Sequence, residues 1–233
     1  MPVRVRHGAT ALLALSVLCL TAACGGGGDG EEGKPAADAP AASAEPLTAE
    51  QMAAAVLVLE DLPSGWAKTS APTSEEPSPR AAEPECQPLA DLLGSKVGGV
   101  EAGGNADFQQ DGGRTELTQQ VFTFPGSGAA DRVAAIGEAV EACPTVNVTV
   151  EGNEVPVKIA RTDVPKIGQT SQSFAMTLAL APGVEVTADL VVAQEGTGFT
   201  RVAFVNDGGA EARKTHADLV TRVGDRFVEG VRG

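Results

Sequence analysis

The stretch Ser173–Val192, SFAMTLALAPGVEVTADLVV, alternates between apolar and more polar side chains on both sides of Pro182-Gly183. Apolar residues at every second position are typical of a β-strand with one face in the core and the other in water. A Pro-Gly pair between two such runs predicts a tight turn. The stretch therefore predicts an antiparallel hairpin with Phe174 and Val192 on its buried face.

Shorter runs of the same kind predict further strands at 116–124, 146–150, 155–159 and 199–205. These strands follow one another through short glycine turns, which favours an antiparallel meander. Helical patterns precede, interrupt and follow them. The order predicts a single α+β domain over 47–233, with a twisted, mainly antiparallel sheet flanked by helices.

Four helices are expected beside these strands. Thr48, with Gln51 three residues later, predicts a capping box that opens a helix ended by Pro63-Ser64-Gly65. A short helix is expected at 86–93, and longer ones are expected before Pro144 and from Ala210 to about Glu229. The intervening residues 67–85, rich in Pro, Ser and Glu, predict a mobile surface loop.

The first 46 residues are expected to lie outside the folded domain. Residues 1–23 combine a basic head with a ten-residue apolar run, which is typical of a secretory signal peptide. Thr21-Ala22-Ala23 before Cys24 resembles a lipobox, with Thr21 where a branched apolar residue is usual, so cleavage by an ordinary signal peptidase near Ala23 is the alternative. Residues 24–46 lack branched aliphatic and aromatic side chains and predict a disordered tether. We therefore expect a lipid on Cys24 that anchors the protein to the outer face of the cytoplasmic membrane.

Charge and composition exclude one large class of partner. The chain has a net charge of −14, and without residues 1–23 it keeps 15 basic and 31 acidic residues. Such a surface repels nucleic acid, and no basic stripe offsets it, so nucleic-acid binding is excluded. The chain has one Trp and no Tyr, which disfavours carbohydrate recognition through stacked rings.

The four cysteines divide between the leader and the domain. Cys19 lies in the apolar run of the signal and Cys24 at its predicted cleavage site, so Cys86 and Cys143 remain in the domain. An even pair in an exported protein predicts a disulfide. A metal site or redox pair would need CxxC spacing or a nearby histidine, and the sequence has neither.

The segment Leu57–Trp66, LVLEDLPSGW, resembles the start of the PknH-like sensor domain family of actinobacterial lipoproteins and receptor ectodomains. The motifs Cys86-x-Pro88-Leu89, Ala142-Cys143-Pro144 and Val164–Gly168 follow in the family's order. The resemblance implies a twisted antiparallel sheet flanked by helices around one wide cleft, a proposed ligand site. Family members commonly carry two disulfides, whereas this domain has cysteines for one. No kinase domain accompanies it, so any signal is expected to pass through a partner.

Motifs of catalysis are missing from the sequence, which contains no HExxH, GxSxG, CxxC or Walker pattern. Residues 105–116 match some calcium-loop positions, but Gln110 stands where glycine is required. His216 is interpreted as a packed helix residue or as a pH-sensitive group lining the cleft. Trp66 is interpreted as a core plug or as a cleft residue. They are the weak ligand-binding candidates, and no cofactor or metal is expected.

These observations predict a function in binding. We expect a non-enzymatic, membrane-anchored lipoprotein whose sensor-like domain binds a small apolar ligand or an envelope protein. The alternatives are a structural or assembly partner of the cell envelope, and an envelope enzyme with an unrecognised site.

Overall fold

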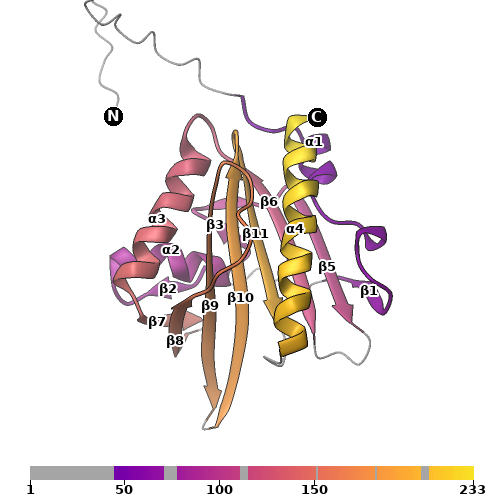
Figure 1. Cartoon of the computed structure of the whole chain (residues 1–233). Helices are drawn as coiled ribbons and strands as arrows, with labels where there is room; N and C mark the ends of the chain where they lie inside the picture. The colour runs from indigo at the N-terminus through magenta and orange to yellow at the C-terminus, as the bar shows by residue number, and fades with distance from the viewer. Residues whose placement is uncertain (1–44, 71–77, 111–114, 151, 182, 206–209) are drawn as a thin grey trace, which may run out of the picture. The chain divides into compact units, whose positions relative to one another are not determined.

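The computed structural model describes residues 45–70, 78–110, 115–150, 152–181, 183–205 and 210–233. These residues form one domain in which a large antiparallel sheet is flanked by helices (Figure 1). The α+β fold predicted from the sequence is confirmed. Residues 1–44, which include the predicted signal peptide, the predicted lipidation site Cys24 and most of the predicted tether, lie outside the described residues.

The strands are β1 Trp66–Thr69, β2 Arg80–Ala81, β3 Lys96–Val97, β4 Val100–Glu101, β5 Gly104–Gln110, β6 Glu116–Thr123, β7 Thr145–Val150, β8 Asn153–Arg161, β9 Thr170–Ala181, β10 Val184–Glu195 and β11 Gly198–Val205. The α-helices are α1 Ala49–Ala54, α2 Gln87–Ala90, α3 Gly128–Ala142 and α4 Ala210–Arg232. Short 3₁₀ helices lie at Leu59–Asp61, Pro84–Cys86 and Asp91–Leu93.

Nine strands form the main sheet in the order β1-β5-β6-β11-β10-β9-β8-β7-β2, and all neighbours are antiparallel. The predicted hairpin is β9–β10, in which Phe174 pairs with Leu190 and Thr177 with Thr187. Phe174 and Val192 are fully buried, as predicted. The first two strands along the chain, β1 and β2, occupy the two opposite edges of the sheet.

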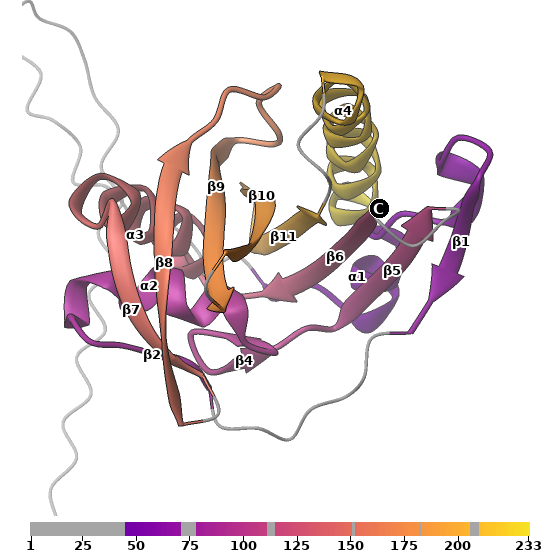
Figure 2. The same cartoon turned by 90° about the horizontal axis from the view of Figure 1, so that it is seen from below.

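Apolar cores lie on both faces of the sheet because its central strands alternate between two apolar sides. On β10, Leu190 and Val192 pack in the core beneath α2 and α3, whereas Val191 and Ala193 pack in the core beneath α1 and α4. Figure 2 shows α3 and α4 on opposite sides of the strands. The sheet is therefore a central layer with an apolar core on each face.

Two connections differ from the sequence prediction. Helix α1 ends at Ala54, although apolar spacing predicted a helix as far as Pro63. The buried Gln119 of β6 is the reason, because its Oε1 accepts from the Leu57 N–H (2.8 Å) and its Nε2 donates to the Ala55 carbonyl (3.1 Å). The predicted loop at 67–85 instead begins as β1, which pairs with β5, and contains β2.

The predicted disulfide is present between Cys86 and Cys143, whose Cα atoms are 6.0 Å apart. Cys86 precedes α2 and Cys143 directly follows α3, where Pro144 begins the connection to β7. Both cysteines are buried in the core beneath these helices. The disulfide therefore ties the start of α2 to the end of α3 on this face of the sheet.

Candidate functional site

The two residues singled out in the sequence, Trp66 and His216, meet at the same phenylalanine. The Phe204 ring of β11 lies 6.4 Å from the Trp66 ring and stacks on the His216 ring at 5.0 Å and 10°. Both candidates are buried, at 7% and 5% exposure. Trp66 belongs to the core beneath α4, His216 is a residue of α4 itself, and neither lines the grooves described below.

His216 lies next to one carboxylate. Its Nδ1 is 4.0 Å from Oδ2 of Asp189, and its buried Nε2 has no hydrogen-bond partner in the described part of the chain. Burial lowers the pKa of the imidazole, and the nearby Asp189 opposes that shift. The ring is therefore a neutral packing element at pH 7.

An open groove of about 520 Å³ is lined by the β8–β9 connection and the C-terminal half of α4. Its lining residues are Pro165, Lys166, Ile167, Gly168, Val220, Thr221, Gly224, Asp225, Val228, Glu229, Arg232 and Gly233. We call it the loop groove. Its volume falls within the range of small-ligand sites in proteins.

Glycines shape the loop groove from both sides. Gly224 has no side chain where Ile167 packs, since a Cβ there would lie 3.2 Å from Ile167 Cγ1. Gly168 adopts a positive φ of 57°, and a Cβ on it would lie 2.5 Å from the carbonyl oxygen of Gln194. The connection therefore approaches both the helix and β10 more closely than side chains would permit.

The wall of the loop groove is fixed to the β10–β11 turn. The Gln169 N–H donates to the Gln194 carbonyl (2.9 Å), and the Gly196 N–H donates to Gln169 Oε1 (3.1 Å). The Ile167 N–H donates to Ser171 Oγ (3.2 Å). These bonds hold the wall in place without help from a ligand.

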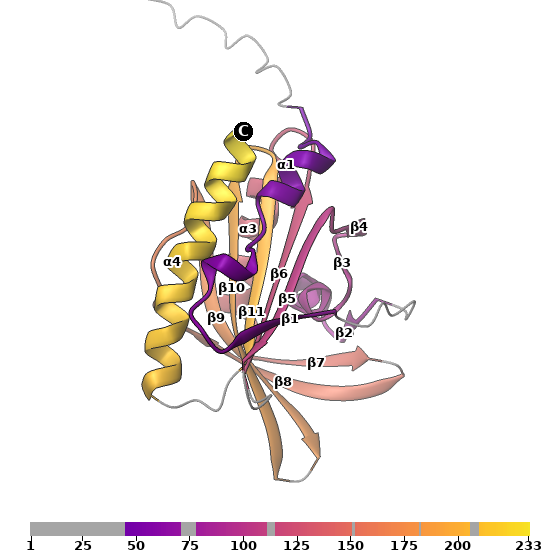
Figure 3. The same cartoon turned by 90° about the vertical axis from the view of Figure 1, so that its right-hand side faces the viewer.

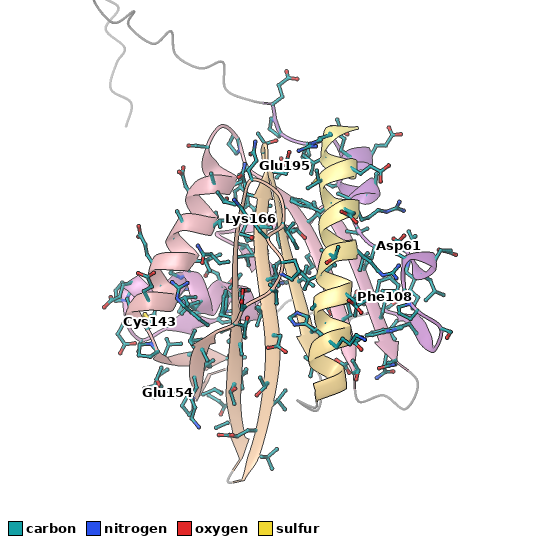
Figure 4. The ribbon with its side chains drawn as sticks, in the orientation of Figure 1. Asp61, Phe108, Cys143, Glu154, Lys166 and Glu195 are labelled. Carbon is teal, nitrogen blue, oxygen red and sulfur yellow. A yellow bond between two sulfur atoms is a disulfide. The ribbon has the colours of Figure 1, made fainter. Side chains whose placement is uncertain are left out.

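The rim of the loop groove carries both signs of charge. Arg232 donates from Nε and Nη2 to Oε1 of Glu195, at 3.0 and 2.8 Å. Lys166, Asp225 and Glu229 are exposed. Figure 4 shows Lys166 and Glu195 toward the same end of the strands, beside α4, whereas Cys143 and Glu154 lie toward the other end.

A second groove, also of about 520 Å³, lies between α1 and α4. Its lining residues are Thr48, Glu50, Gln51, Ala54, Arg226, Glu229, Gly230 and Gly233. We call it the helix groove. Gly230 brings the helices together, since a Cβ on it would lie 2.4 Å from the Ala55 nitrogen, and Gln51 Nε2 donates to the Val231 carbonyl (3.1 Å).

Sequence reasoning did not identify either groove. The resemblance implied one wide cleft, whereas these two grooves flank the C-terminal half of α4. Gly224 and Gly230 were the available signal, because a glycine inside an amphipathic helix often marks a close approach. The spacing of apolar residues in the sequence did not indicate that residues 165–168 pack against Gly224.

The described residues assemble no metal cluster, since no group of three or more His, Cys, Asp and Glu side chains converges among them. Asn105, Asp107 and Gln109, which matched calcium-loop positions, lie on the regular strand β5. The buried Arg201 donates to the Leu92 carbonyl (2.7 Å) and to Gln120 Oε1, and burial lowers its pKa to about 10. It remains protonated at pH 7 and fastens the 3₁₀ helix Asp91–Leu93 to the sheet.

Within the described ranges, no helix is both long and apolar enough to cross a membrane. No protein-family model matches the chain, and no curated protein has a similar sequence. Among solved structures, the extracellular domain of PknH from Mycobacterium tuberculosis resembles the fold with a TM-score of 0.50 and 13% identity. The match covers 81% of this chain and 98% of that domain. The likeness shows that this chain shares the fold of that domain.

Proposed function

We propose that this protein is a lipid-anchored, extracytoplasmic binding protein that holds a small, mainly apolar ligand in the loop groove and performs no catalysis. An envelope protein that docks over the same groove is the alternative occupant. The lipid on Cys24 would hold the domain at the outer face of the cytoplasmic membrane. Lipidation rests on the sequence pattern around Cys24, and the non-catalytic sensor role is supported by the fold.

The loop groove is the observation that carries this proposal. Pro165 and the half-buried Val228 supply apolar surface, Ile167 and Val220 are almost fully buried in the core, and the hydrogen bonds of Gln169 keep the wall preformed. A preformed apolar site with a few polar groups at its rim is typical of small-ligand binding. Trp66 and His216 pack on Phe204 and line neither groove, so they are not ligand contacts of this site.

Native mass spectrometry of the protein purified from its own host tests the proposal. We expect a bound small molecule in the wild type. Thr221→Phe places a ring in the loop groove from an exposed helix position, and it should abolish the bound mass. Ala54→Phe is the matched control, because Ala54 is an exposed helix residue of the helix groove, and it should retain the ligand.

Two results would contradict the proposal. One is a ligand that Thr221→Phe retains as fully as the wild type. The other is a wild-type protein that carries no ligand and acquires none from a host extract. Hydrolytic turnover that is lost in Thr221→Phe would favour the envelope enzyme instead.

The anchor is tested separately. We expect Cys24→Ser to release the protein into the medium or to leave its precursor uncleaved, as judged by membrane fractionation and immunoblotting. A Cys24→Ser variant that is still processed and still retained at the membrane would disprove the lipid anchor.

A further inference from the structure

The C-terminal half of α4 is fastened to the domain by several independent contacts. Arg222 donates to the Asp61 carbonyl (3.1 Å), and Arg226 donates to the Val56 carbonyl (3.3 Å). Figure 3 shows α1 beside the C-terminal end of α4, with the N-terminal end of the helix away from it. Within the described part of the helix, the buried apolar side chains are Leu219, Val220, Val223, Phe227 and Val231. Apolar packing and arginine hydrogen bonds therefore begin only after residue 218.

The N-terminal turns of α4 are held differently. Among residues 214–218, His216 is the one buried side chain, at 5% exposure, and the other four are exposed or half-buried. Its ring stacks on Phe204 of β11 at 5.0 Å and 10°, and Phe204 in turn contacts Trp66 of β1. Among the described side chains, this stack is therefore the contact that holds residues 214–218 on the sheet.

One charged group of the described chain acts on the imidazole. Asp189 of β10 places Oδ2 at 4.0 Å from Nδ1 of His216, and β11 contributes the uncharged Phe204. The charged residues of β1, of the β8–β9 connection and of the adjoining turn of α4 are exposed: Lys68, Asp163, Lys166, Lys214 and Asp218. The protonation state of the ring therefore depends on its burial and on Asp189.

The site suits a neutral imidazole and not a cation. Nε2 is buried without a hydrogen-bond partner in the described part of the chain, so in the neutral ring it can carry the lone pair. An imidazolium has an N–H donor on both nitrogens. Nε2–H would then be a buried donor without an acceptor, and Nδ1 lies beyond hydrogen-bond distance of Asp189. Burying such a cation is costly, which is why burial lowers the pKa of His216 while Asp189 opposes the shift.

We propose that His216 is an acid-sensitive latch for the N-terminal turns of α4. When the ring is protonated, residues 214–218 leave the sheet and the imidazolium enters water, while the C-terminal half of the helix stays in place. Phe204 then loses its cover, so the aromatic pair that it forms with Trp66 gains exposure. The inference does not depend on a ligand, because His216 lies outside the lining of the loop groove.

Hydrogen exchange followed by mass spectrometry tests the latch in the full protein. An imidazole in water titrates near pH 6.5, whereas the closed helix keeps His216 neutral to a lower pH. The ratio of open to closed helix should therefore rise as pH falls below 6.5, by up to about tenfold for each pH unit. We expect amide protection of residues 214–218, corrected for intrinsic exchange, to fall by as much as about fivefold between pH 6.5 and 5.5. Helix α3 should keep its protection.

Tryptophan fluorescence gives a second readout of the same opening. Trp66 is the single tryptophan of the chain, so its emission reports the aromatic cluster without a label. We expect the emission to shift to longer wavelengths over the pH range in which residues 214–218 lose protection.

Variants separate the latch from a general effect of acid. His216→Phe keeps an aromatic ring on Phe204 but binds no proton, so protection and emission should not change between pH 7.5 and 5.5. Asp189→Asn removes the carboxylate that favours the charged ring, so acid should reduce protection more than in the wild type. Asp163→Asn, at an exposed carboxylate of the β8–β9 connection, is the matched control and should respond as the wild type does. Asp189→Asn keeps the proposal testable if His216→Phe does not fold.

Three results would overturn the inference. The first is protection of residues 214–218 that stays constant down to pH 5.5. The second is an equal loss of protection in α3, which would mean that the whole domain unfolds together. The third is a wild-type pH response that persists in His216→Phe. Each of them would leave the proposed function of the loop groove untouched.

Discussion

Gln119→Leu is the sharpest test of how the domain is held together. The substitution places an apolar side chain of similar size at a position with 0% exposure. It removes the acceptor of the Leu57 N–H and the donor to the Ala55 carbonyl, which lie 2.8 and 3.1 Å from the amide. Each buried backbone group left without a partner costs about 1–3 kcal/mol. The two losses, partly offset by the added apolar burial, predict destabilisation by about 3 kcal/mol.

Urea denaturation monitored by circular dichroism measures this change. The midpoint should fall while the slope of unfolding free energy against urea stays constant, because the same surface is exposed on unfolding. Gln109→Leu on β5 is the control, since this side chain is partly exposed, and its effect should stay within about 0.5 kcal/mol. A Gln119→Leu loss below about 1 kcal/mol would refute the idea that this amide ends α1 and fixes residues 55–57.

Three further predictions concern stability. Replacing Cys86 and Cys143 by Ser should lower the unfolding free energy by about 4 kcal/mol in urea, because the bond closes a loop between residues 57 positions apart; an unchanged midpoint would contradict this. Burial depresses the pKa of His216, so the unfolded chain binds the proton more readily and stability should fall as pH drops below about 6.5. His216→Phe should weaken this pH dependence between pH 7.5 and 5.5 in thermal melts, and an identical pH profile would count against it. Gly230→Ala should lower the melting temperature although alanine favours helices, because its Cβ would lie 2.4 Å from the Ala55 nitrogen; a higher melting temperature would show that α1 moves aside freely.

The long central elements could be predicted because their causes are local. The alternation over Ser173–Val192 and the apolar stripe that ends at Cys143 each specify an element and its buried face without knowledge of the rest of the chain. Thr48 and Gln51 form the predicted capping box for the same reason. The disulfide could be predicted because the domain has an even number of cysteines and the protein is expected to be exported; no geometric argument was needed.

The missed features have causes far away in the sequence. Helix α1 stops at Ala54 because of Gln119, 64 positions away from Ala55. Strands β1 and β2 contain four and two residues, so their pairing with β5 and β7 is specified by those partners rather than by their own pattern. The loop groove depends on how closely residues 165–168 approach Gly224, which periodicity cannot reveal.

The position of β1 and β2 at opposite edges constrains the curvature of the whole sheet. Eight spacings between nine flat strands amount to about 38 Å, whereas the connection from Thr69 to Arg80 contains ten residues and spans at most roughly 36–40 Å. A flat sheet would stretch this connection to its limit, so the sheet must curl and bring its margins toward each other. Because β1 and β2 cover them, the outer edges of β5 and β7 are closed to intermolecular pairing as long as these two short strands stay in place.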